Sequence, residues 1–248
     1  MWSLRQEQIG GGTTDRSKDK TLRTTFHEQL TELVADTARM CAGAAEMNNA
    51  ATLLLFDDEH LGETLHVSLR TVSRAGRSIS DHAFSLLALQ APVASELRAV
   101  VATLHIVRDI DRMAGLAANV ARIAMREEPR AIVPTEARDV LREMSAAAAA
   151  SALGAQRAIE SSDQTLARRM EQADCRMNVL NRQLFEIVMQ PDWPHGTVVA
   201  ADLVLVSRFY ERYADHAVNI ARHIYFQSTG DHVSLVEPAE PTPRKVET

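Results

Sequence analysis

A segment of fifteen residues occurs twice in this chain, and this repeat limits the folds that the chain can adopt. RDIDRMAGLAANVAR, which begins at Arg108, aligns without a gap on RFYERYADHAVNIAR, which begins at Arg208. Arg, Ala and Asn recur at matching positions of the two segments, at an offset of one hundred residues. That offset has the size of a whole domain, so we expect a duplicated domain rather than a solenoid of short repeats.

Apolar residues recur at spacings of three and four along most of the chain, which is the signature of helices that bury one face. The pattern and its breaks predict six helices, over about residues 24–56, 58–90, 92–127 and 135–160, from 163 to the break at QPDWPHG, and over 197–227. Pro92 suits the first turn of the third helix, and Gly230 can end the last one in a left-handed conformation.

The composition supports a core assembled between helices. Hydrophobic residues make up 46% of the chain but aromatic residues only 4%, which leaves few of the residues typical of strands. We therefore expect an all-α fold of two tandem three-helix bundles, over residues 22–129 and 130–230. A polar extension over residues 1–21 and a Pro-rich tail over residues 231–248 are expected to be disordered.

Charge and hydropathy exclude several classes of partner. The formal net charge is −6, and the 27 basic residues are spread along the chain, so we expect no nucleic acid as a partner. No apolar run has the length of about 18 residues that a membrane span needs, and the start lacks a signal-peptide core. These features predict a cytoplasmic protein. Cys41 and Cys175 lack metal-binding spacing and are expected to be buried free thiols.

Acidic side chains in the second half predict a metal site. Glu211 and Asp215 stand four residues apart on one helical face, where their charges repel unless a cation lies between them. Asp174 and Asn178 have the same spacing on the preceding helix, and an antiparallel neighbour can bring their oxygens to Glu211 and Asp215. Four such ligands suit Mg²⁺, Mn²⁺, iron or zinc. The alternative is an ordinary solvated face on which Arg208 or Arg212 neutralises the acids.

The two repeated segments, together with LLALQAPVASELR before the first, resemble the PhoU family of phosphate-uptake regulators. The resemblance covers residues 22–230 and implies six helices in two bundles, with metal clusters held by acid pairs on the second and third helices of each bundle. It also implies a homodimer that reaches the membrane only through its partners. Those partners are the ATPase of the phosphate ABC transporter and a sensor histidine kinase, through which the family represses the phosphate-starvation response.

Departures from the family pattern weaken the metal sites. The first copy keeps Asp111 but has Gly115 where the second acid belongs, and Leu69 and Ser73 replace the acids of its second helix. In the second copy Asn178 replaces an acid. We therefore expect at most one metal site, in the second bundle.

Other polar residues of the repeat have less specific expectations. His216 is either a nearby metal ligand or a hydrogen-bonded residue at the helix surface or in the core. Arg112 and Arg212 occupy equivalent positions and are expected to orient the acids, hold a partner, or form salt bridges within the bundles. Asn119 and Asn219 are expected to hydrogen-bond between helices.

Two rival functions stay open at this point. A ferritin-like di-iron oxidase needs Glu-x-x-His on two helices, and only Glu63 with His66 fits that spacing. A metal-free helical adaptor is the other possibility. No motif of a hydrolytic or redox enzyme is present in the sequence, so we expect a regulatory protein rather than an enzyme.

Overall fold

Long helices form all the regular structure that we describe. The computed structural model describes residues 13–56, 62–90, 92–126, 133–161 and 164–231, and within these ranges every regular element is a helix. In chain order the helices are α1 Thr13–Leu55, α2 Gly62–Gln90, α3 Ala94–Ala124, α4 Thr135–Ser161, α5 Gln164–Val188 and α6 Gly196–Thr229. None of the helices in these ranges is long and apolar enough to span a membrane.

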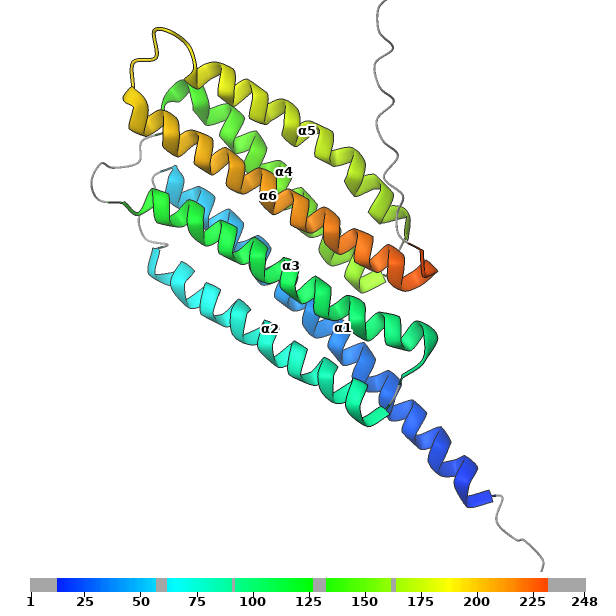
Figure 1. The fold of residues 1–248 in the computed structure, drawn as a ribbon. Helices are drawn as coiled ribbons and strands as arrows, with labels where there is room; N and C mark the ends of the chain where they lie inside the picture. Colours follow the sequence, from blue (N-terminus) through cyan, green and yellow to red (C-terminus); the bar gives the residue numbers. More distant parts are fainter. Residues whose placement is uncertain (1–12, 57–61, 91, 127–132, 162–163, 232–248) are drawn as a thin grey trace, which may run out of the picture.

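The helices form two bundles that lie side by side. Figure 1 shows α1, α2 and α3 together and α4, α5 and α6 together, with α3 against α6 and α1 against α4. The helices α2 and α5 lie at opposite edges of the molecule. The start of α6 lies at the end of α3, so these two helices run antiparallel. This arrangement confirms the predicted all-α fold of two tandem three-helix bundles.

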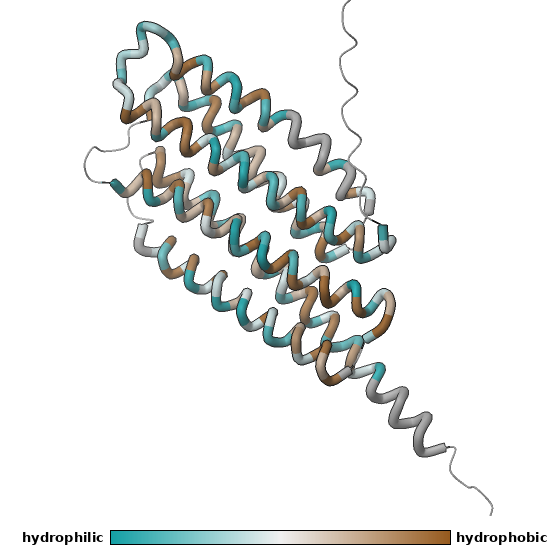
Figure 2. Tube along the Cα trace, viewed as in Figure 1, coloured by the Kyte–Doolittle hydropathy of each residue, from teal (hydrophilic) through white to brown (hydrophobic). Residues whose placement is uncertain are grey.

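One hydrophobic core extends through both bundles. Buried apolar residues from all six helices form a single cluster, and Figure 2 shows apolar and polar positions alternating along each helix as expected for one buried face. The Tyr213 hydroxyl of α6 donates a hydrogen bond to the Ala44 carbonyl of α1 at 3.0 Å. The Tyr210 hydroxyl lies 2.8 Å from that of Thr52, which also contacts Ser145 of α4. The bundles are therefore joined by a buried interface rather than by a linker alone.

An ion pair joins the two bundles at one end of this interface. Arg126, just after α3, makes a two-pronged contact with Asp202 of α6, and the Nη1–Oδ1 distance is 3.1 Å. Asp202 is 8% exposed, so its charge needs this partner. The contact fixes the end of α3 against the start of α6.

Several predicted boundaries differ from the structure. The first helix begins at Thr13, inside the extension that we expected to be disordered. TTDRSKDK contains no Gly or Pro, and extending an existing helix costs little per residue. The third helix begins at Ala94, and Pro92 precedes it instead of occupying its first turn. The expected cap Gly230 is confirmed, with φ of 81° and an N–H donating to the Phe226 carbonyl. The rest of the tail lies outside the described residues.

Candidate functional site

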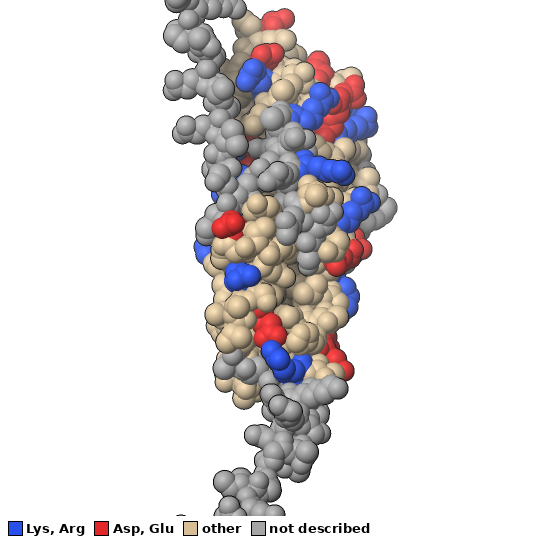
Figure 3. All heavy atoms as spheres, turned by 90° about the vertical axis from the view of Figure 1, so that its right-hand side faces the viewer, with Lys and Arg blue, Asp and Glu red and all other residues tan. Residues whose placement is uncertain are grey.

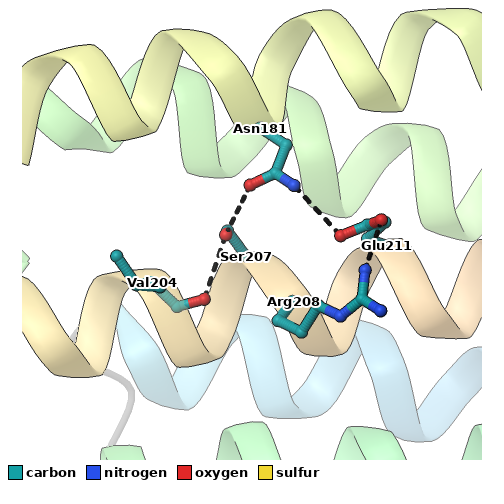
Figure 4. Close-up of polar contacts among 5 residues, drawn as sticks. All are labelled: Asn181, Val204, Ser207, Arg208 and Glu211. Atoms are coloured by element: carbon teal, nitrogen blue, oxygen red, sulfur yellow. Dashed lines mark hydrogen bonds and ion pairs between the residues drawn. The ribbon is translucent and has the colours of Figure 1, made fainter.

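Polar side chains of α5 and α6 surround Glu211, the first residue of the predicted metal site. Figure 4 shows that Asn181 of α5 donates its amide N–H to Glu211 Oε2 at 3.0 Å, while Arg208 holds the other carboxylate oxygen. This contact with Glu211 raises the pKa of Arg208. The Ser207 hydroxyl donates to Asn181 Oδ1 at 3.0 Å and also lies near the Val204 carbonyl. Glu211 is thus held by a cation from its own helix, as in the alternative considered from the sequence.

The other predicted ligands lie on the same two helices. Asp215 is partly buried on α6, and Asn178 is exposed on α5. The backbone of Asp174 belongs to α5, but its side chain lies outside the described part of the structure. The contacts of Asn181 fix the antiparallel register of α5 and α6. Asp174 lies two helical turns before Asn181 on α5. Its backbone is therefore level with the stretch of α6 that contains Asp215.

The described side chains of this region fit a metal ion poorly. Across the described residues, no three His, Cys, Asp or Glu side chains are grouped so that they could hold a metal. The Glu211 carboxylate already has a guanidinium and an amide donor as partners, and a metal would have to displace Arg208. The metal site stays a prediction that depends on the side chain of Asp174.

The first copy has no second acid beside Asp111. Asp111 is exposed and accepts a hydrogen bond of 2.9 Å from the Ser73 hydroxyl of α2. A Cβ built on Gly115 would meet nothing within 4 Å, so there is space for a side chain at the position where the family has an acidic residue. Asp111 and Glu211 are equivalent positions of the repeat, and each accepts a hydrogen bond from the preceding helix, Asp111 from Ser73 and Glu211 from Asn181.

One aspartate and three histidines form a chain of pairwise contacts between α3 and α6. His216 Nδ1 is 2.8 Å from Asp109 Oδ1, and His223 Nε2 is 3.5 Å from Asp109 Oδ2. The His223 ring also stacks on His105, with ring centroids 5.0 Å apart and planes inclined by 14°. His216 therefore takes the hydrogen-bonded alternative and joins the two bundles.

The histidines change the acidity of Asp109. Burial favours the protonated carboxyl group and by itself would raise the pKa of Asp109. The hydrogen bonds and positive charge from His216 and His223 outweigh burial, so the pKa of Asp109 is lower than its ordinary value. The aspartate is consequently a carboxylate that holds both imidazoles in place.

The expectation for the repeated asparagines was wrong. Among the described residues, the amides of Asn119 and Asn219 do not link helices. Each accepts a hydrogen bond from the arginine three residues later in its own helix, at 2.7 Å from Arg122 and 3.1 Å from Arg222. An arginine at i+3 on the same face reaches the amide oxygen more easily than a neighbouring helix does. The same contact occurs in both copies of the repeat.

Of the three alternatives for the repeated arginines, the salt bridge within a bundle is absent among the described residues. Arg112 and Arg212 are exposed, and across the described residues neither forms an ion pair. Instead both line a groove of about 760 Å³ between α3 and α6. The groove is also lined by Leu69, His105, Arg108, Asp109, Asp111, Gly115, Leu116, Ala118, Asn119, Arg122, His216, Asn219 and His223.

Sequence reasoning missed Asp109, His105 and His223, and the repeat itself contained the signal. The offset of one hundred residues places Asp109 opposite Phe209 in the alignment and His216 opposite Leu116. In each case one copy has an apolar residue and the other a titratable one. Asp109 and His216 thus each stand where the other copy has an apolar residue. Once α3 and α6 are known to be adjacent, this indicates that the two side chains contact each other.

Comparison with known proteins finds the same two copies. The family model of the PhoU domain matches residues 37–124 and again residues 141–224. The chain belongs to the PhoU family. Both matches fall within the two bundles, and the resemblance seen in the repeated segments is confirmed.

Curated PhoU proteins cover most of the chain. Phosphate-specific transport system accessory protein PhoU homolog 2 of Mycobacterium tuberculosis is 42% identical over 211 residues, which are 84% of this chain and 99% of the relative. PhoU homolog 1 of Mycobacterium leprae is 41% identical over 211 residues, which are 84% of this chain and 95% of the relative.

Crystal structures of PhoU proteins share the fold. The structure of the phosphate transport system regulatory protein PhoU from Streptococcus pneumoniae matches with a TM-score of 0.76 at 20% identity, over 85% of this chain and all of that one. PhoU from Pseudomonas aeruginosa matches with a TM-score of 0.73 at 24% identity, over 83% of this chain and 100% of that one. At these identities the likeness concerns the fold alone.

Proposed function

We propose that this chain is a regulatory accessory protein of phosphate uptake. In this proposal it represses the phosphate-starvation response while phosphate is plentiful, by coupling the ATPase of the phosphate ABC transporter to a sensor histidine kinase. The observation that carries the proposal is the match of 42% identity along 84% of the chain to a protein named as a phosphate-specific transport system accessory protein.

The surface and the core are those expected of a protein that acts by binding other proteins. On the face seen in Figure 3, acidic and basic side chains are interspersed with uncharged ones, so no charge of one sign dominates that face. The core shared between the bundles favours a rigid platform. We include in the proposal a homodimer at the cytosolic face of the membrane, which associates with the membrane only through its partners.

The two rival functions have less support. His66 is exposed on α2, whereas the ligands of di-iron bundles point into the core, which disfavours the oxidase. A metal-free adaptor keeps support from the engagement of Glu211 by Arg208. That alternative differs from the proposed regulator only in its metal content, and metal analysis distinguishes the two.

The genetic test is deletion of the gene followed by measurement of phosphate-regulated transcripts in phosphate-rich medium. Because Mycobacterium tuberculosis has a PhoU homolog 1 and a homolog 2, any second copy in the genome is deleted as well. We expect the transcripts to rise in the deletion strain and to return to the repressed level when the wild-type gene is restored. Unchanged transcripts in a strain that lacks every copy would contradict the proposal.

A further inference from the structure

The groove between α3 and α6 has an excess of positive charge that the rest of the molecule does not share. Four arginines and two aspartates line it, although the chain as a whole has a net charge of −6. Both aspartates already have donors, since Asp109 holds two histidines and Asp111 accepts from Ser73. The groove therefore presents guanidinium groups rather than neutralised pairs.

Three of these arginines lack an acidic partner in the described part of the chain. Arg108, Arg112 and Arg212 form no ion pair there, whereas Arg122 is held by Asn119. Arg112 and Arg212 come from equivalent positions of the two copies, and because α3 and α6 are antiparallel, both reach the same groove. Like charges gathered in a hollow repel each other and attract an anion, and the planar guanidinium matches phosphate oxygens in pairs.

The size and lining of the groove indicate which anion fits. A volume of about 760 Å³ lies within the range of about 300 to 1,000 Å³ that is typical of sites for small organic molecules, and it is far larger than one orthophosphate requires. The side-chain amide of Asn219, the stacked rings of His105 and His223, and the apolar Leu69 and Leu116 provide hydrogen-bonding and apolar surface beside the arginines.

We propose that this groove binds a small anion with several phosphate groups, of the size of a nucleoside triphosphate or a short inorganic polyphosphate. Arg112 and Arg212 bind the phosphates from the two bundles, and Arg108 extends the site toward α2. Bound in this way, the ligand bridges both copies of the repeat. The inference goes beyond the proposed function and stands on the groove alone, so either can fail without the other.

Isothermal titration calorimetry of the full-length, metal-free protein tests the site, with tripolyphosphate and ATP as probes at about 0.15 M salt. We expect saturable binding of at least one probe, with one site per chain. The double variant Arg112→Gln, Arg212→Gln should bind at least about tenfold more weakly, because two charge-assisted contacts are lost. Circular dichroism and thermal unfolding confirm that the variant is folded.

A matched control separates the groove from the net charge of the protein. Arg70 of α2 and Arg182 of α5 are exposed and do not line the groove. The double variant Arg70→Gln, Arg182→Gln has the same net charge as the groove variant and should bind within about twofold of wild type.

Four results would overturn the proposal. They are the absence of saturable binding by both probes, a loss of binding in the groove variant no greater than in the control variant, binding of orthophosphate or sulfate as strong as that of tripolyphosphate, and binding to vesicles with anionic lipids while both free probes fail. The last result would assign the groove to a membrane surface. Because none of these measurements involves gene regulation, they leave the genetic test independent.

Discussion

At the scale of single residues, one polar side chain in the described part of the interior has no hydrogen-bond partner. Asn48 of α1 is 1% exposed, and within the described structure neither its amide nitrogen nor its amide oxygen has a hydrogen-bond partner. A buried amide in this state costs about 1 to 3 kcal/mol. The residue is therefore a point at which the stability of the fold can be improved.

We expect Asn48→Leu to stabilise the protein by about 1 kcal/mol, because an apolar side chain of similar size has no polar group to desolvate. Urea denaturation followed by circular dichroism measures the change. The neighbouring Asn49 is exposed, so Asn49→Leu is a control that should stay within about 0.5 kcal/mol of wild type. A loss of stability in Asn48→Leu would reveal a partner for the amide.

Burial also raises the pKa of the Cys41 thiol, which makes the stability of the protein depend on pH in the alkaline range. Burial, together with the charge of Glu160, raises the pKa of Cys41 from 9.0 to about 12. A folded pKa above the unfolded value means that the stability contribution is complete below pH 9 and is lost as pH rises toward 12.

The free energy of unfolding of the wild-type protein should therefore fall by about 1.4 kcal/mol between pH 7.5 and pH 10 on account of Cys41 alone. Cys41→Ala should lack this part of the decrease, whatever its stability at neutral pH. Urea denaturation at both pH values measures the difference. The same pH dependence in both proteins would contradict this assignment.

At the scale of helices, the sequence predicted the number and most of the extents of the elements, because these depend on local periodicity and caps. Gly230 ended α6 as expected, since the left-handed cap is a local preference of glycine. The start of α1 was wrong because the polar residues before residue 24 are compatible with a helix. The pairing of Asp109 with His216 could not be predicted, because periodicity shows which face is buried but not which helix covers it.

At acidic pH, the stability of the protein should depend on the ionised Asp109 in the contact between α3 and α6. The pKa of Asp109 is lowered, so its stability contribution is present above the unfolded pKa and is lost as pH falls through the lower folded value. Asp109→Asn should lower the melting temperature at pH 6, and the difference from wild type should shrink toward pH 3. Asp139→Asn, at an 89% exposed side chain, is a control that should show no such trend. A difference that is independent of pH would contradict the ionised role of Asp109.

The pairing of α5 with α6 decides whether a metal binds. If Asp174 supplies the missing ligand, metal analysis of the purified protein should find about one Mn, Fe or Zn ion per chain, and Glu211→Ala, Asp215→Ala should lose it. The variant Ser73→Ala, which changes the equivalent pair of helices in the first copy, should keep the metal. Negligible metal in wild type and variant alike, after growth in metal-supplemented medium, would contradict the site and favour the adaptor.

At the scale of the whole molecule, the shared core predicts that the two bundles unfold together. The Tyr213 hydroxyl reaches across the interface to α1, and Arg126 with Asp202 fixes the end of the interface. Calorimetry should show a single transition for the wild-type protein and for the variants Tyr213→Phe and Tyr213→Ala. The losses should be about 1 kcal/mol for the hydroxyl and about 3 to 5 kcal/mol for the whole side chain. Two separate transitions in the wild-type protein would contradict a common core.

The antiparallel contact of α3 with α6 makes the molecule equivalent to a dimer whose subunits have been fused into one chain. In a true homodimer of one repeat, every residue at such an interface would occur at both ends of it. Fusion removes that constraint, and this chain has used the freedom. One end pairs Asp109 with His216, and the corresponding positions at the other end are Phe209 and Leu116. A ligand or partner that meets this interface therefore encounters an asymmetric surface, whose two ends present different side chains.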